Sequence, residues 1–177
     1  MGKTVYQSED FMSLRRFSDI KIPVQAELVK KRIQIVESRL IRKTSLLYER
    51  RLINSPELAA ALGQQLFDSF DKEYLYAVYL TVKCEPIAIE LVSIGTLNST
   101  VVCPRDILKS ALLCGAYGFI IFHNHPSGGD IIPSKDDIRM TKRLKEASQL
   151  IGIELNDHII LSDIGYVSLI SNCEISS

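Results

Sequence analysis

The stretch GFIIFHNHPSGGDIIPSKDDI, residues 118–138, decides the fold because it joins an apolar segment to a loop of turn residues and then to a helix start. GFIIF contains no polar side chain and is bounded by a glycine, which predicts a buried central β-strand. The Pro- and Gly-rich loop that follows predicts a chain reversal. Ser134 is a suitable helix cap, so a helix is expected to begin there and to lie over the end of the strand.

Two of the three histidines of the chain, His123 and His125, lie at the end of this predicted strand. Side chains two positions apart in a strand project from the same face, so both imidazoles can reach one point. Asp137 lies in the first turn of the helix that the loop brings back. Two imidazoles and one carboxylate fit a Zn²⁺ site whose fourth position stays open for water, as in catalytic zinc sites. Water activated there is a nucleophile for hydrolysis.

Each of these residues also has a simpler interpretation. Ser134 and Asp137 have the spacing of a capping box, in which the acid is favoured by the helix dipole. Asp136 is a competing ligand, although its side chain points elsewhere around the helix by about 100°. The pairing of His123 with His125, in a chain with so few histidines, favours a metal site. Ser134 could cap the helix and still direct its hydroxyl toward the site.

The rest of the chain shows alternating helix and strand signals. Helical spacing predicts helices over INSPELAAALGQQLFDSF (residues 53–70), with Ser55 as cap, and over RDILKSALLCGAYG (residues 105–118), after Pro104. Further strands are predicted over KRIQIV (31–36), EYLYAVYLTV (73–82), IAIELVSIG (87–95), STVVC (99–103), IGIEL (151–155), HIILS (158–162) and GYVSLI (165–170). The predicted fold class is α/β or α+β, with one mixed central sheet flanked by helices.

Charge divides the chain into two parts. The 177 residues have no net charge, but residues 1–54 carry twelve basic and six acidic residues, whereas residues 55–177 carry nine basic and fifteen acidic ones. We expect a basic N-terminal extension with one strand, followed by one domain over residues 55–177. The basic extension either marks a nucleic-acid interface or is a solvated surface that neutralises the other half of the protein.

Composition excludes several protein classes. No signal peptide and no apolar run of membrane-spanning length is present, which predicts a cytoplasmic protein without a membrane partner. The four cysteines show no CxxC spacing, which predicts neither a thiolate zinc site nor a disulfide framework.

The motifs HNHPSG, PSKDD and DHIILSD together resemble the RadC-type branch of the JAMM (MPN/JAB) metalloprotease-like family. The upstream stretch SIGTLNSTVVCPRDILKSALLCGAYGFIIF is similar to the same family, so the resemblance covers roughly residues 55–177. It implies an MPN/JAB-like fold, which is cytidine-deaminase-like. One departure is the loop between His125 and Ser134, which has eight residues where the family has seven.

The resemblance implies that His123, His125 and Asp137 bind Zn²⁺ and that Ser134 helps to stabilise an oxyanion. The family also uses a glutamate near the start of an early strand to hold and deprotonate water, and Glu73 matches that place. A carboxylate at the mouth of a strand could act as general base and acid. The alternatives are that Glu73 is merely an exposed residue beside Lys72, or that the role belongs to Glu85 or Glu90, which match less well.

His158, which follows Asp157, is the last candidate. It could contact a metal ligand or hydrogen-bond a substrate, since carboxylate neighbours often orient the histidines of metal sites. Alternatively, it is a strand histidine that is satisfied by its own surroundings.

The predicted function is that of a zinc-dependent hydrolase of the JAMM metalloprotease type, which cleaves a peptide or isopeptide bond. The alternative is a DNA-repair-associated accessory protein of RadC type, without hydrolysis, which contacts phosphates through a basic segment. That segment contains Arg39, Arg42, Lys43, Arg50 and Arg51. A third hypothesis is a scaffold that has kept only the fold, but a scaffold has no need for a convergent His-His-Asp set.

Overall fold

The computed structural model describes residues 34, 36–67, 71–95, 103–126 and 131–171. Residues 39–177 form one compact unit. In the preceding unit the described positions are 34 and 36–38, which are exposed and belong to no helix or strand. The strand predicted over residues 31–36 therefore lies mostly outside the described residues.

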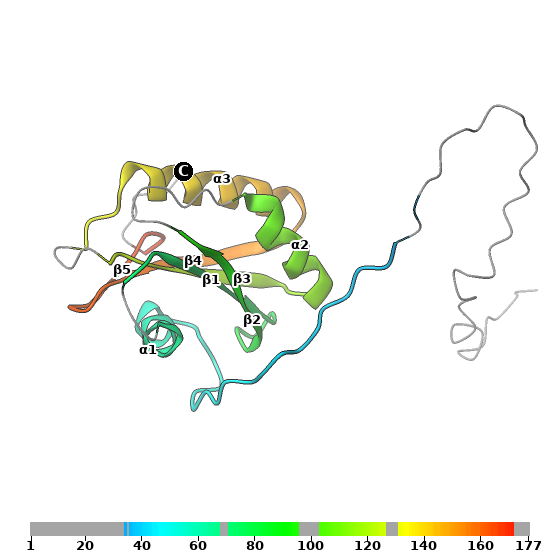
Figure 1. The fold of residues 1–177 in the computed structure, drawn as a ribbon, viewed down its shortest axis with the longest axis horizontal. Coiled ribbons are helices and arrows are strands. Elements are labelled where there is room, and N and C mark those ends of the chain that lie inside the picture. The colour runs from blue at the N-terminus through cyan, green and yellow to red at the C-terminus, as the bar shows by residue number, and fades with distance from the viewer. Residues whose placement is uncertain (1–33, 35, 68–70, 96–102, 127–130, 172–177) are drawn as a thin grey trace, which may run out of the picture. The chain divides into compact units, whose positions relative to one another are not determined.

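A five-stranded sheet forms the centre of the compact unit (Figure 1). Its strands are β1 (Tyr74–Leu80), β2 (Pro86–Ile94), β3 (Gly118–Asn124), β4 (Glu154–Leu161) and β5 (Tyr166–Ser168). They lie in the order β2-β1-β3-β4-β5, with β3 and β4 parallel and every other pair antiparallel. All seven residues of β3 are buried, so the apolar segment that opens the decisive stretch is the middle strand, as predicted.

Three helices cover the two faces of this sheet, which confirms the predicted fold class. Figure 1 shows α1 (Pro56–Leu66) on one side, and α2 (Pro104–Cys114) with α3 (Lys135–Leu150) on the other. The predicted first helix ran to residue 70, but α1 ends earlier because Phe67 is extended and packs its ring edge-on against Tyr76, with centroids 5.3 Å apart. No helix in the described ranges combines the length and apolar character that crossing a membrane requires.

Each face of the sheet buries its own apolar cluster. On the α1 side, Val78, Ile120, Phe122 and Leu161 pack with the helix, and α1 approaches the sheet at Gly63. A Cβ atom at Gly63 would come within 2.8 Å of both Phe122 and Leu161. The other cluster, under α2 and α3, includes Leu75, Ala77, Tyr79, Ile107, Phe119, Ile121, Leu144 and Leu155. The ends of the central strands are therefore held from both faces.

One prediction about the strands is wrong, because the segments IGIEL and HIILS contribute to the single strand β4. The polar pair Asn156 and Asp157 lies inside this strand. The buried Asp157 carboxylate accepts hydrogen bonds from the Ser168 hydroxyl and from the backbone N–H groups of His158 and Ile170. Burial raises the pKa of the Asp157 carboxyl in spite of these bonds. The predicted strand over residues 99–103 lies outside the described residues except for Cys103, which precedes α2.

Candidate metal centre

The end of β3 and the start of α3 meet at one edge of the sheet. His123 is buried and forms the last pair between β3 and β1. His125 follows directly after the end of β3. Helix α3 begins with a complete capping box at Ser134 and Asp137. The Ser134 hydroxyl accepts from the Asp137 N–H at 3.1 Å, and the Ser134 N–H donates to Asp137 Oδ2 at 2.8 Å. The cap therefore fixes the Asp137 carboxylate in the first turn of the helix.

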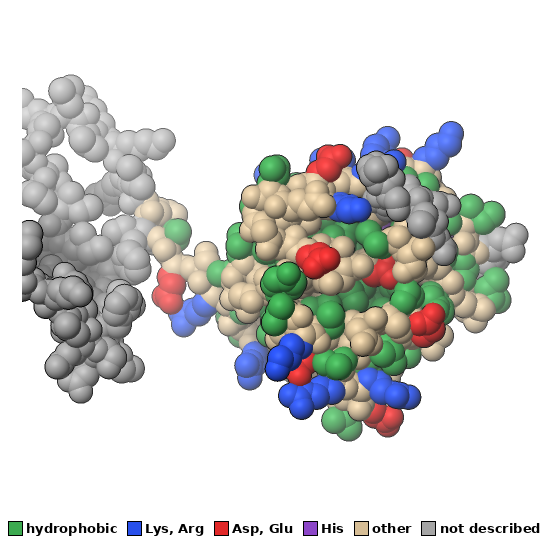
Figure 2. Space-filling model, turned by 180° about the vertical axis from the view of Figure 1, so that it is seen from behind, with side chains coloured by type: hydrophobic (Ala, Val, Ile, Leu, Met, Phe, Trp, Pro, Cys, Tyr) green, Lys and Arg blue, Asp and Glu red, His purple; other side chains and the backbone are tan. Residues whose placement is uncertain are grey.

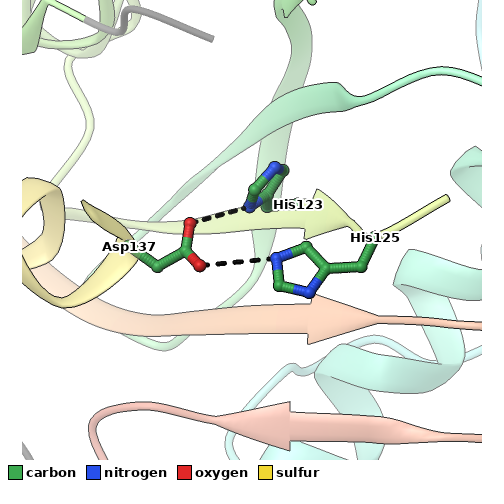
Figure 3. A group of neighbouring side chains, drawn as sticks. All are labelled: His123, His125 and Asp137. Carbon is green, nitrogen blue, oxygen red and sulfur yellow. Dashed lines mark ion pairs between the residues drawn. The ribbon is translucent and has the colours of Figure 1, made fainter. Parts of the chain in front are cut away.

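The Asp137 carboxylate faces both imidazoles, one oxygen toward each ring (Figure 3). Its Oδ1 is 3.3 Å from His123 Nδ1, and its Oδ2 is 3.4 Å from His125 Nε2. The two rings meet edge to face, with centroids 5.1 Å apart. One ligand atom from each of the three residues lies within 4.8 Å of the others. The predicted convergence of these side chains on one point is thus present.

The cluster has the chemistry of a divalent-metal site. Both ring nitrogens of His123 are buried and, apart from the 3.3 Å approach of Nδ1 to Asp137 Oδ1, have no polar partner among the described residues. A buried polar atom without a hydrogen bond is costly unless another ligand satisfies it. Two imidazoles and one carboxylate are a ligand set that suits Zn²⁺ and leaves a coordination position open. His123, His125 and Asp137 could therefore hold a metal ion.

The charge of Asp137 also suits the binding of a metal ion. Burial acts to raise the pKa of this carboxyl, but its interactions with His123, His125 and Ser134 outweigh burial and hold the pKa below its usual range. The carboxylate is therefore anionic at neutral pH. An anionic oxygen beside two imidazole nitrogens attracts a cation, which would screen the carboxylate and bind both rings.

A buried polar pair, Thr141 and His158, lies next to the candidate metal ligands. The Thr141 hydroxyl donates to the Asp137 C=O at 2.6 Å and contacts His158 Nδ1, also at 2.6 Å. Because a carbonyl can only accept, the hydroxyl proton points to Asp137, and His158 Nδ1 must carry the proton that it donates to Thr141. Burial, followed by repulsion from His123, lowers the pKa of His158 to about 3, so its ring is neutral. The rings of His158 and His123 have centroids 6.3 Å apart.

Replacing Thr141 by valine should destabilise the protein by about 1–3 kcal/mol, because the buried Nδ1–H of His158 would lose its acceptor. Valine has nearly the same size, so the loss would come from the hydroxyl. The free energy of unfolding, measured in urea, tests this prediction. Thr141→Ser keeps the hydroxyl and should retain most of the stability. Equal stability of the valine variant and the wild type would contradict the assigned hydrogen bond.

Glu73 lies directly before β1 and is half-buried. Its C=O accepts from the Gly95 N–H at 2.8 Å, so extended pairing with the end of β2 continues to this residue. In the pairing of β1 with β3, Leu75 lies opposite His123. Glu73 precedes Leu75 by two positions, so it lies toward the end of the strands that carries His123, His125 and Asp137. Its catalytic role stays a prediction.

The competing acidic residues have other partners. Asp136 is exposed and pairs with Arg139 on the surface of α3 at 2.9 Å. Glu85 pairs with Arg51 at 2.6 Å. Glu90 accepts a 2.6 Å hydrogen bond from the buried Tyr79 hydroxyl on β1. None of these three carboxylates belongs to the candidate metal-binding group found among the described residues.

Two polar residues at the site were not identified from the sequence. Thr141 lies four positions after Asp137, so it shares a helix face with this candidate ligand, and that spacing was an available signal. Asn124 lies between the two histidines and is completely buried. Its signal was weaker, because the position between two histidines of a strand faces the opposite side of the sheet.

Comparison with known proteins gives the family. The model of the RadC-like JAB domain matches residues 53–174. A UPF0758 protein of Clostridium acetobutylicum is 48% identical over 122 residues, which cover 69% of this chain and 53% of that protein. For a UPF0758 protein of Bacillus licheniformis, the identity is 48% over 123 residues, covering 68% of this chain and 54% of the relative. A UPF0758 protein of Desulforudis audaxviator is 44% identical over 117 residues, covering 66% of this chain and 50% of the relative.

This chain spans about half the length of these curated relatives. The matched region contains the three helices and five strands of the described residues, together with the three candidate metal ligands. The chain belongs to the RadC-like JAB domain family.

Proposed function

We propose that this protein is a zinc-dependent hydrolase that cleaves a peptide or isopeptide bond. The observation that carries the proposal is the convergence of His123, His125 and Asp137 at the end of the central strand. These three residues would hold the ion through two imidazole nitrogens and one carboxylate oxygen. Bound there, Zn²⁺ would act as a Lewis acid toward the scissile carbonyl and toward water.

Glu73 is the proposed proton carrier. Its carboxylate would take a proton from the attacking water and deliver it to the leaving amine nitrogen when the C–N bond breaks. Its place supports this role, because Glu73 is two positions before Leu75 along an extended chain, and Leu75 pairs with His123. Residues with this spacing project to the same face of a sheet. The carboxylate would therefore lie on the same side of the sheet as the metal ligands.

Ser134 is the proposed donor to the carbonyl oxygen of the substrate. Its hydroxyl oxygen accepts from the Asp137 N–H, which leaves the hydroxyl proton available for a further bond. The residue is exposed, so a substrate could reach it. A donor that is already held in place by a helix cap needs little reorganisation as negative charge develops on the oxygen.

The proposal is tested by hydrolysis in ¹⁸O-labelled water. Zinc-loaded protein is incubated with a mixture of peptides and with peptides joined through a lysine side chain, and the products are analysed by mass spectrometry. New carboxyl ends that carry ¹⁸O are expected with the wild type and not with the variant His123→Ala, His125→Ala. The absence of labelled products with zinc-loaded wild type, or equal labelling by both proteins, would overturn the proposal.

DNA binding by the basic segment is the second candidate function. Arg39, Arg42, Lys43 and Arg50 are exposed, whereas Arg51 forms an ion pair with Glu85. On the side of the molecule drawn in Figure 2, Lys and Arg side chains are interleaved with Asp and Glu, without one continuous basic patch. Such a distribution can neutralise only a few phosphates, so binding through it should be weak and should weaken further as salt rises.

Fluorescence anisotropy with a labelled duplex at 50 and 200 mM salt tests this second function. The neutralised variant replaces Arg39, Arg42, Lys43, Arg50 and Arg51 by glutamine. Binding that weakens with salt and is lost in this variant would support it. Binding that is absent, or unaffected by the five substitutions, would exclude the segment as a DNA contact.

A further inference from the structure

The side chain of Asn124 forms a bridge between β3 and the chain on both sides of Glu73. Its Oδ1 accepts a hydrogen bond from the Tyr74 N–H at 2.6 Å, and its Nδ2 donates to the Lys72 C=O at 2.7 Å. Asn124 is completely buried. One amide therefore binds the two backbone groups that flank Glu73.

The chemistry of these two bonds requires an amide. A backbone N–H can only donate and a carbonyl can only accept, so the orientation of the Asn124 amide is fixed by its partners. An aspartate would keep the acceptor for Tyr74 but lose the donor to Lys72. A leucine of similar size would lose both bonds and leave two backbone groups without partners.

The bridge begins where regular strand pairing ends. The register between β1 and β3 runs from Leu80 opposite Gly118 to Leu75 opposite His123. Beyond this pair the Asn124 side chain supplies the next contact between the two segments. On the other side of β1, the Gly95 N–H holds the C=O of Glu73 at 2.8 Å. Glu73 is thus fixed from both neighbouring strands, while its side chain remains half-buried at the edge of the site.

We propose that Asn124 is a positioning residue that sets where the Glu73 carboxylate lies relative to the His123, His125 and Asp137 cluster. This inference rests on the proposed function, in which Glu73 moves the proton. Asn124 lies between the two proposed imidazole ligands in the chain. Three consecutive residues, two at the end of β3 and one directly after it, would therefore set both imidazoles and the proton carrier in register. An error of about 1 Å in the place of a proton carrier can cost about a hundredfold in rate.

The first measurement uses the metal-free protein. Amide hydrogen exchange of Tyr74 should accelerate at least tenfold in Asn124→Leu, because its acceptor is removed. Asn124→Asp keeps that acceptor, so Tyr74 should stay protected. If Asn124→Leu fails to fold, Asn124→Asp still tests the inference, because it should change the position of Glu73 while Tyr74 stays protected. The control is Val78→Ala, a buried change in β1 that destabilises the core without touching the bridge.

The second measurement loads the same proteins with Co²⁺, a paramagnetic substitute for zinc. The pseudocontact shift of the Glu73 amide reports its place relative to the ion. It should change in Asn124→Leu and Asn124→Asp and stay the same in Val78→Ala. On a substrate that the wild type cleaves, kcat should fall about 10–100-fold in Asn124→Leu while KM is little changed.

The outcomes separate the two claims. If the wild type binds no Co²⁺, the proposed function fails, and the exchange of Tyr74 still decides whether the bridge exists. If Co²⁺ binds but neither Tyr74 exchange nor the Glu73 shift changes in Asn124→Leu, the inference is overturned and the metal centre stands. Faster exchange with an unchanged Glu73 shift would also overturn it, because the bridge would then not position Glu73.

Discussion

Replacement of Glu73 by glutamine is expected to lower kcat about 10²–10⁴-fold while zinc content stays at the wild-type level. Glutamine has the same shape as glutamate, but it cannot take a proton from water at neutral pH. The three proposed metal ligands are unchanged, so a bound ion should remain. The measurement is steady-state hydrolysis of a substrate found with the wild type, together with elemental analysis of each protein.

The control for this prediction is Glu85→Gln. Glu85 matched the expected position of the proton carrier less well, and it pairs with Arg51 on the surface. Its replacement should leave kcat within about twofold of the wild type, since an exposed ion pair contributes little. Full activity of a zinc-replete Glu73→Gln variant would remove Glu73 from the proposed mechanism.

Replacement of Asp137 by asparagine is expected to weaken zinc binding roughly 10²–10³-fold. Structural zinc sites gain roughly 10–16 kcal/mol from four ligands, so one ligand contributes on the order of 3 kcal/mol. Asparagine keeps an oxygen that can accept from the Ser134 N–H, so the helix cap should survive. Competition with a chromophoric chelator measures the change in affinity.

Asp136→Asn is the matched control, because it removes the same charge from the neighbouring position. Asp136 is exposed and pairs with Arg139. Zinc affinity of this variant should equal that of the wild type within about threefold, since a surface ion pair adds little. If both variants lose zinc equally, the general charge of the helix start, and not coordination by Asp137, would explain binding.

The three candidate ligands could be predicted from the sequence because the rules that bring them together are local. Strand alternation places His123 and His125 on one side, and the capping pattern places Asp137 in the first turn of α3. The eight-residue loop did not disturb this arrangement. The helix start is fixed by Ser134 through its two hydrogen bonds, so the loop can differ in length without moving the carboxylate.

The bridge of Asn124 could not be predicted in the same way, because its partners are distant in sequence. Its amide binds backbone groups 50 and 52 positions earlier. The continuity of β4 could not be predicted for the same reason. Two separate strands were predicted there, on either side of Asn156 and Asp157. The groups that satisfy this carboxylate inside the strand include Ser168 and Ile170, which lie 11 and 13 positions later. Only the folded sheet brings such pairs together.

The identity of the atoms around the metal is the most direct test of the central claim, that His123, His125 and Asp137 bind one zinc ion. X-ray absorption at the zinc edge, on protein supplied with one equivalent of zinc, should show only nitrogen and oxygen neighbours at roughly 2.0–2.1 Å, with the scattering pattern of two imidazoles. A sulfur neighbour at roughly 2.3 Å, or protein that retains no zinc after dialysis, would contradict the account.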